Sequence, residues 1–137
     1  MNPVTGLSLG RIAVGTLALA RPDLAAQALQ LDARANPQLP YLSRMFGSRE
    51  IAIGLATLFA KGRGRTGLVT LGIAVDAADL ATGLIGPRQG EVPQRTGLAL
   101  AAPAAGAVLA GVLGLRTTSR ADRRAARKAR RAARKAA

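Results

Sequence analysis

The sequence contains no cysteine, no histidine and no tryptophan among its 137 residues. Without thiols or imidazoles it cannot form a disulfide, ligate haem, hold an iron–sulfur cluster or build an ordinary zinc site. A Ser-His-Asp triad is excluded as well, because it requires a histidine. No motif positions another nucleophile or a metal, so we expect neither an enzyme nor a bound cofactor.

Aromatic residues are nearly as scarce. Only Tyr41, Phe46 and Phe59 occur, whereas there are 16 glycines and apolar residues make up 49 % of the chain. Inside a water-soluble helix each glycine costs about 1 kcal/mol relative to alanine. Membrane helices, by contrast, use small residues to bring their backbones close together. The composition therefore favours a membrane protein over its alternative, a soluble bundle of alanine-rich helices.

Four apolar runs cover most of the chain, at about residues 4–20, 42–60, 66–86 and 96–115. Each has the length that an α-helix needs to cross about 30 Å of hydrocarbon. The sequence therefore predicts an all-α protein: a bundle of four transmembrane helices over residues 1–115, followed by a basic cytoplasmic tail over residues 116–137.

Two connecting segments have their own patterns. The segment 21–41 contains Pro22 and Asp23, which suit a helix start, so we expect a short interfacial helix on the outer surface that ends at Asn36 and Pro37. The glycines and cations of residues 61–65 predict a tight basic turn between the second and third runs.

Positive charge is concentrated at one end of the chain. The formal net charge is +13, and residues 116–137 hold ten Lys and Arg against one acid. With four crossings, the N-terminus, the basic turn and the tail share one side, which the positive-inside bias places in the cytoplasm. We expect a multi-pass protein of the cell (plasma) membrane with both termini cytoplasmic. The segment 18–20 also has the form of a signal-peptide cleavage site, and cleavage there would leave three crossings in the same orientation.

Five ionisable residues lie near the middle of the apolar runs. A charge at the centre of a membrane helix costs about 2.5–3.5 kcal/mol, so these side chains must face inward and pair. In the first three runs, small and polar residues recur every three or four positions and form one stripe per helix. The stripes contain Ser8, Arg11, Gly15 and Ala18; Gly47, Glu50, Gly54 and Thr57; and Gly72, Asp76, Asp79, Gly83 and Gly86. We predict an intramembrane charge network that consists of Arg11, Arg49, Glu50, Asp76 and Asp79.

Two arginines against three acids leave one negative charge in this network, unless Arg44 reaches in from the end of its run. Asp76 and Asp79 would repel each other, so we expect one of them to hold a proton at neutral pH. The network is then either a structural device that sets helix register or a proton or cation site. The fourth run has an uncharged small-residue stripe, which we expect to be its packing face: Ala99, Pro103, Gly106, Ala110 and Gly114.

The tail alternates cations with alanine, a composition that favours helix. Because it follows the last apolar run directly, the nearest polyanion is the lipid headgroup region, and we expect anionic lipid as its partner. The tail has no aromatic side chain for base stacking, which makes nucleic acid an unlikely partner. Docking on an acidic protein surface stays open. The predicted lipid-binding residues are Arg123, Arg124, Arg127, Lys128, Arg130, Arg131, Arg134 and Lys135.

Three motifs in residues 4–115 support a family resemblance. They are GRIAVG at residues 10–15, FGSREIAIG at residues 46–54, and DAAD at residues 76–79. Together they resemble small four-helix integral membrane proteins of actinobacteria, of the DoxX-like type, whose function is unknown. The resemblance implies a four-helix membrane fold without a settled activity. Some DoxX-like proteins are linked to quinone-dependent redox complexes, which for a chain without histidine or cysteine implies a partner subunit.

The sequence thus predicts a small accessory or scaffold subunit of a cell-membrane complex, with other membrane proteins or further copies of itself as partners. The alternative is a small proton- or cation-coupled transporter that uses Asp76 and Asp79.

Overall fold

The computed structural model describes the backbone of residues 3–136 and the side chains of residues 3–117. Within these residues the chain is all-helical and contains no strand. Its five helices are α1 (Pro3–Ala20), α2 (Pro22–Ala28), α3 (Leu39–Phe59), α4 (Gly62–Ile85) and α5 (Gln94–Ala136). Three helical segments are long and apolar enough to span a membrane: α1, α4 and residues 94–117 of α5. α3 occupies the second predicted run but carries three charged residues, and it is not among these three.

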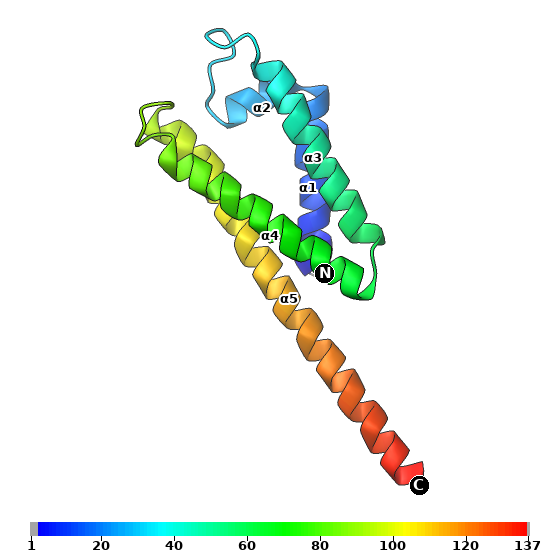
Figure 1. Cartoon of the computed structure of the whole chain (residues 1–137). Helices are drawn as coiled ribbons and strands as arrows, with labels where there is room; N and C mark the ends of the chain where they lie inside the picture. Colours follow the sequence, from blue (N-terminus) through cyan, green and yellow to red (C-terminus); the bar gives the residue numbers. More distant parts are fainter. Residues whose placement is uncertain (1–2, 137) are drawn as a thin grey trace.

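The long helices form two pairs. α1 packs along α3, and α4 packs along α5, whereas the two pairs meet each other less extensively through α1–α5 and α3–α4. Figure 1 shows the N-terminal end and the α3–α4 connection at one end of the bundle, with α2 and the α4–α5 loop at the other. α5 continues beyond the bundle at the N-terminal end and runs without a break through Arg116, where we placed the start of the tail.

The short helix α2 ends earlier than predicted. We expected it to reach Asn36, but its last residue is Ala28. The cause is local: Gln30 adopts a left-handed conformation with φ 56°, and the next N–H, that of Leu31, donates to the carbonyl of Ala26 at 2.9 Å. This 6→1 bond is the mark of a Schellman motif, which closes a helix.

The predicted basic turn over residues 61–65 is shorter than expected. α4 already begins at Gly62, so only Ala60 and Lys61 connect it to α3. Gly62 has φ +54°, a backbone conformation that a glycine adopts without strain. The remaining cations of this segment, Arg63 and Arg65, therefore belong to the first turn of α4.

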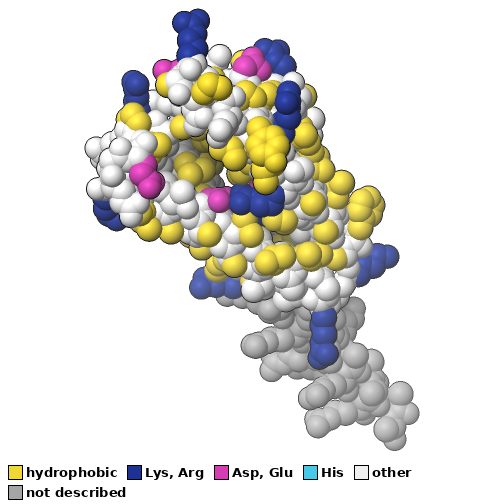
Figure 2. All heavy atoms as spheres, turned by 45° about the horizontal axis from the view of Figure 1, so that its top comes forward, with side chains coloured by type: hydrophobic (Ala, Val, Ile, Leu, Met, Phe, Trp, Pro, Cys, Tyr) yellow, Lys and Arg dark blue, Asp and Glu magenta, His cyan; other side chains and the backbone are white. Residues whose placement is uncertain are grey.

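Small and polar side chains are buried and large apolar side chains are exposed, which is the reverse of the distribution in a water-soluble helical bundle. The buried side chains are mostly alanine or polar, and the polar ones include Ser8, Thr57 and Thr96. Many large aliphatic and aromatic side chains are exposed instead, among them Leu9, Val14, Met45, Phe59, Leu71 and Leu109. Figure 2 shows apolar side chains spread over the outer surface. Water-soluble proteins bury such residues, whereas an environment of lipid stabilises them where they are.

Glycines allow close contact within each pair. A Cβ atom on Gly15 of α1 would lie 2.5 Å from the carbonyl oxygen of Gly47 of α3. In the second pair, a Cβ atom on Gly83 of α4 would lie 2.7 Å from the carbonyl oxygen of Gly97 of α5. Both pairs of backbones are in direct contact, which only small residues permit.

The first two predicted stripes are buried as expected, but the α5 stripe is largely wrong, because only Gly114 of its five residues is buried. Pro103 and Gly106 are exposed, and a Cβ atom on Gly106 would meet no atom within 4 Å. The buried face of α5 consists of Thr96, Gly97, Ala101, Ala104, Gly111 and Gly114. Small residues occur all around this helix, and no charge among them marks the inner side.

Candidate functional site

The structure brings together all five residues of the predicted charge network. They come from the middle of α1, the middle of α3 and the second half of α4. In space they form a chain in which acids and bases alternate, in the order Asp76, Arg11, Glu50, Arg49, Asp79. The chain crosses the region where the two helix pairs meet, so it ties α4 to both α1 and α3.

Arg11 is the buried centre of this chain. Its Nη1 donates to Oε2 of Glu50 at 2.5 Å, and its Nη2 donates to Oδ2 of Asp76 at 2.6 Å and to the carbonyl of Gly72 at 3.2 Å. Arg11 is only 7 % exposed, and its two acidic partners are 5 % exposed. The planar guanidinium suits two carboxylates at once, since its N–H groups lie in a rigid fork.

Gly72 makes room for this arginine. A Cβ atom at this position would lie 3.1 Å from Nη2 of Arg11 and would press on the guanidinium. The absence of a side chain therefore lets the guanidinium reach the backbone carbonyl of α4. A glycine one turn before Asp76 is thus part of the network, although it carries no charge.

Arg49 forms the more open half of the network. Its Nη2 donates to Oδ2 of Asp79 at 2.7 Å, and its Nε donates to Oε1 of Glu50 at 3.2 Å. The ring of Phe46 lies 4.9 Å from the guanidinium carbon, within range of a cation–π interaction. The side chain of Arg49 is 38 % exposed and that of Asp79 is 23 % exposed.

Figure 2, turned so that the α2 end comes forward, shows a hollow with one acidic and one basic side chain at its rim. The hydroxyl of Thr96 closes the same end by donating to the carbonyl of Gln30 at 3.0 Å, which joins α5 to the segment after α2.

The five residues of the network carry a formal net charge of −1, as predicted without Arg44. Arg44 does not join it, because this residue is exposed and forms no ion pair among the described residues. Asp76 and Asp79 each face a different arginine rather than each other. That one of them holds a proton remains a prediction. Among the described residues, no group of acids is arranged to hold a metal ion.

Sequence reasoning missed two residues near the network, Arg65 and Phe46. Nη2 of Arg65 donates to the hydroxyl of Thr5 at 3.2 Å, and its Nε is buried without a partner among the described residues. Helical spacing could have found both, since Arg65 lies seven residues before Gly72 and Phe46 lies three before Arg49. Gly72 was already part of a predicted stripe, and Arg49 was part of the predicted charge network.

A second, isolated ion pair lies outside the apolar helices. Nη2 of Arg21 and Oδ2 of Asp23 are 2.8 Å apart at the start of α2, and both side chains are exposed. The hydrogen bond from the Arg21 guanidinium lowers the pKa of Asp23, and the same bond raises the pKa of Arg21. Screening by water leaves such an exposed pair little weight in stability.

The predicted lipid-binding side chains of the tail, Arg123 to Lys135, lie outside the described residues. The backbone that carries them continues α5 as helix to Ala136.

Comparisons with protein-family models, with curated proteins and with solved structures gave no match. The resemblance to DoxX-like proteins therefore remains a prediction from the sequence motifs.

Proposed function

We propose that this chain is a four-helix integral protein of the cell membrane that serves, without catalysis of its own, as an accessory or scaffold subunit of a membrane assembly. The buried part of the charge network carries the proposal. Arg11 holds two carboxylates from two other helices, and all three side chains are buried. Such an arrangement fixes how helices meet, which is the requirement for a rigid scaffold.

The proposal counts α3 as the fourth transmembrane helix. Its 21 residues give a length of about 30 Å. Arg49 and Glu50 are paired within the network, which lowers the cost of placing them in lipid. Arg44 lies near the helix start, where a long side chain can extend its charge to the membrane surface.

The orientation follows from where the cations lie. The N-terminal end of α1, the α3–α4 connection and the exit of α5 from the bundle share one end in Figure 1, and that connection contains Lys61. With that end in the cytoplasm, the bundle obeys the positive-inside bias. The basic tail then begins on the side where anionic headgroups are concentrated, which supports lipid as its partner.

The exposed side of α5 offers a surface for another helix. Pro103 and Gly106 of the predicted stripe face outward, and Ala99 and Ala110 are only half-buried. A second membrane helix, from another protein or from a second copy, can approach such a surface closely.

Purification of the full chain from its own membranes in a mild detergent tests this function. We expect the native chain to elute as a complex with a partner or with further copies. A Cβ atom at Gly106 would meet no atom within 4 Å. Gly106→Leu adds a bulky side chain at this open position and should release the partner, whereas Gly106→Ala should retain it. A native chain that always elutes as a lone monomer contradicts the proposal.

A small proton- or cation-coupled transporter is the second candidate. It is favoured by the surplus negative charge of the network and by the partial exposure of Asp79. Flux assays in proteoliposomes separate the two functions. Loss of flux in the double variant Asp76→Asn with Asp79→Asn, with the fold kept, supports transport. Unchanged flux or loss of the fold assigns the acids a structural role.

A further inference from the structure

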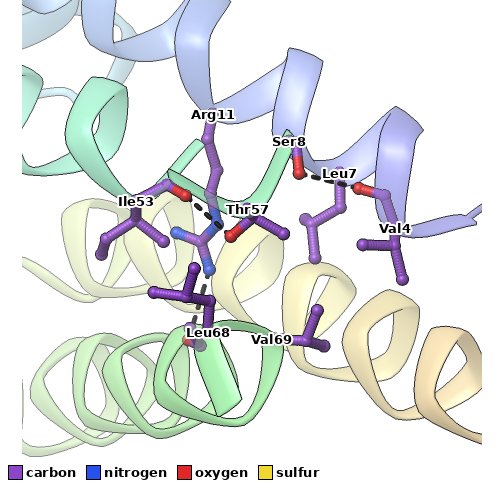
Figure 3. A pocket seen from close by; sticks show the side chains of 9 residues that line it. Val4, Leu7, Ser8, Arg11, Ile53, Thr57, Leu68 and Val69 are labelled. Carbon is purple, nitrogen blue, oxygen red and sulfur yellow. Dashed lines mark hydrogen bonds between the residues drawn. The ribbon is translucent and has the colours of Figure 1, made fainter. Parts of the chain in front are cut away.

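A small cavity lies beside Arg11, on the side of the charge network that is nearer the N-terminus. It sits between α1, α3 and α4, and its volume is about 10 Å³. Figure 3 shows Ser8, Arg11 and Thr57 in its lining beside apolar side chains such as Leu7 and Leu68. On this measure of free space, about 10 Å³ is the least that holds one water molecule. Most of the lining is apolar, so the polar groups decide what the cavity can hold.

The two hydroxyl groups of the lining act as acceptors. Ser8 donates its hydrogen to the carbonyl of Val4 at 2.9 Å, and Thr57 donates its hydrogen to the carbonyl of Ile53 at 2.7 Å. A hydroxyl group has one hydrogen and two lone pairs. Both hydrogens are therefore engaged, and the lone pairs of both oxygens remain for a donor.

Arg11 supplies the donor. A guanidinium has five N–H groups, and among the described residues three of them donate, to Glu50, Asp76 and the carbonyl of Gly72. The remaining two are on Nε and Nη1. The lining contains no carboxylate, so a guest has to accept from Arg11 and donate to Ser8 and Thr57. Water does both, whereas an anion such as chloride has no hydrogen to donate.

Arg65 gives an independent indication of water at this end of the bundle. It precedes Val69 and Gly72 by four and seven residues, and it therefore lies on the same face of α4 as these two lining residues. Its Nε–H is buried without a partner among the described residues. Buried donors are nearly always bonded, and an internal water is a common partner for those that the protein itself does not satisfy.

We propose that this cavity is an internal water site, in which one water molecule accepts a hydrogen bond from Arg11 and donates to the hydroxyl oxygens of Ser8 and Thr57. The site hydrates the centre of the charge network from the N-terminal end of the bundle. The site lies next to Arg11, which binds Glu50 and Asp76, so only this one side chain separates the water from the two acids. The half-exposed Arg49–Asp79 pair lies on the other side of the network.

Nuclear magnetic resonance of the isotope-labelled full chain in detergent micelles tests the site. Cross-relaxation between water and the N–H groups on Nε and Nη1 of Arg11 should have opposite signs in the laboratory and rotating frames, which separates a bound water from proton exchange. Thr57→Val removes one hydrogen-bond acceptor at nearly constant volume and should lower the water signal about fivefold. Ser8→Ala should have the same effect and replaces Thr57→Val if that variant does not fold.

Thr16→Val is the matched control. Thr16 donates to the carbonyl of Ile12 at 2.7 Å in the same i−4 geometry, but it is exposed and lies outside the cavity. This variant should leave the water signal unchanged. Absence of the signal in the folded native chain would overturn the proposal, and so would a signal of native intensity in folded Thr57→Val and Ser8→Ala.

Discussion

Gly15 of α1 and Gly47 of α3 face each other so closely that a Cβ atom on either residue would lie 2.5 to 2.6 Å from the carbonyl oxygen of the other. Arg11 lies four residues before Gly15, and Glu50 lies three residues after Gly47. These two residues form an ion pair. The close backbone contact and the ion pair therefore belong to one interface, and the first makes the second possible.

Gly47→Ala should accordingly destabilise the fold. Its methyl group has no space, because it would lie 2.6 Å from the backbone carbonyl oxygen of Gly15, and overpacking of this kind costs about 1–3 kcal/mol. Gly106→Ala is the control, since its Cβ would meet no atom within 4 Å, and it should change stability by less than about 0.5 kcal/mol. Reversible unfolding in mixed micelles, followed by circular dichroism, measures both. Equal stability of the two variants would contradict the close contact.

Replacement of Arg11 should be among the most damaging single substitutions. Arg11→Gln leaves Glu50 and Asp76 buried without their shared cation, and removal of one partner from a buried ion pair costs about 3–5 kcal/mol. Arg11→Lys should be intermediate, because an ammonium cannot reproduce the fork that serves both carboxylates. Arg44→Gln, at an exposed position, should have little effect. The same unfolding assay ranks the three variants, and a native-like Arg11→Gln would be inconsistent with this role.

The absence of cysteine allows a direct test of orientation. Gly64 and Gln89 are exposed at opposite ends of α4. In intact cells, Gln89→Cys should react with a membrane-impermeant maleimide, whereas Gly64→Cys should react only after the membrane is opened. The reverse pattern would place the basic end outside, contrary to the positive-inside bias.

The Arg21–Asp23 pair predicts a small pH effect outside the apolar helices. The hydrogen bond from Arg21 lowers the pKa of Asp23 below its ordinary value of 3.8. A lowered pKa means that the stabilisation is complete above the unfolded-state pKa and is lost as the pH falls through the folded-state value. Carboxyl chemical shifts should show a titration of Asp23 that moves upward in Arg21→Gln. An unchanged titration would exclude the hydrogen bond in solution.

Much of the inner face could be predicted from the sequence because polar residues are costly in an apolar helix. Ser8 and Arg11, or Glu50 and Thr57, can lie only on the side that faces other helices, so their spacing identifies that side. The apolar runs located α1, α3 and α4 within a few residues for the same physical reason, whereas α5 continues beyond the fourth run to Ala136. Three of these runs lie in α1, α4 and residues 94–117 of α5, which meet the length and composition of membrane spans.

Other features depend on contacts that the sequence pattern does not contain. The packing face of α5 was predicted incorrectly, since residues such as Gly106 and Gly111 are equally small and nothing distinguishes inside from outside. The end of α2 depends on the left-handed backbone conformation of Gln30. Glutamine is not a residue type from which this conformation is predicted. Which arginine pairs with which acid depends on how the two helix pairs cross.

The central claim is that the buried acids and arginines stabilise the bundle by neutralising one another. A double-mutant cycle of Arg11→Gln, Asp76→Asn and their combination, measured by reversible unfolding in bilayer-like micelles, tests it most directly. We predict that the double variant loses less stability than the sum of the single losses, by at least about 1 kcal/mol. Single losses that simply add, or that are both close to zero, would contradict the account.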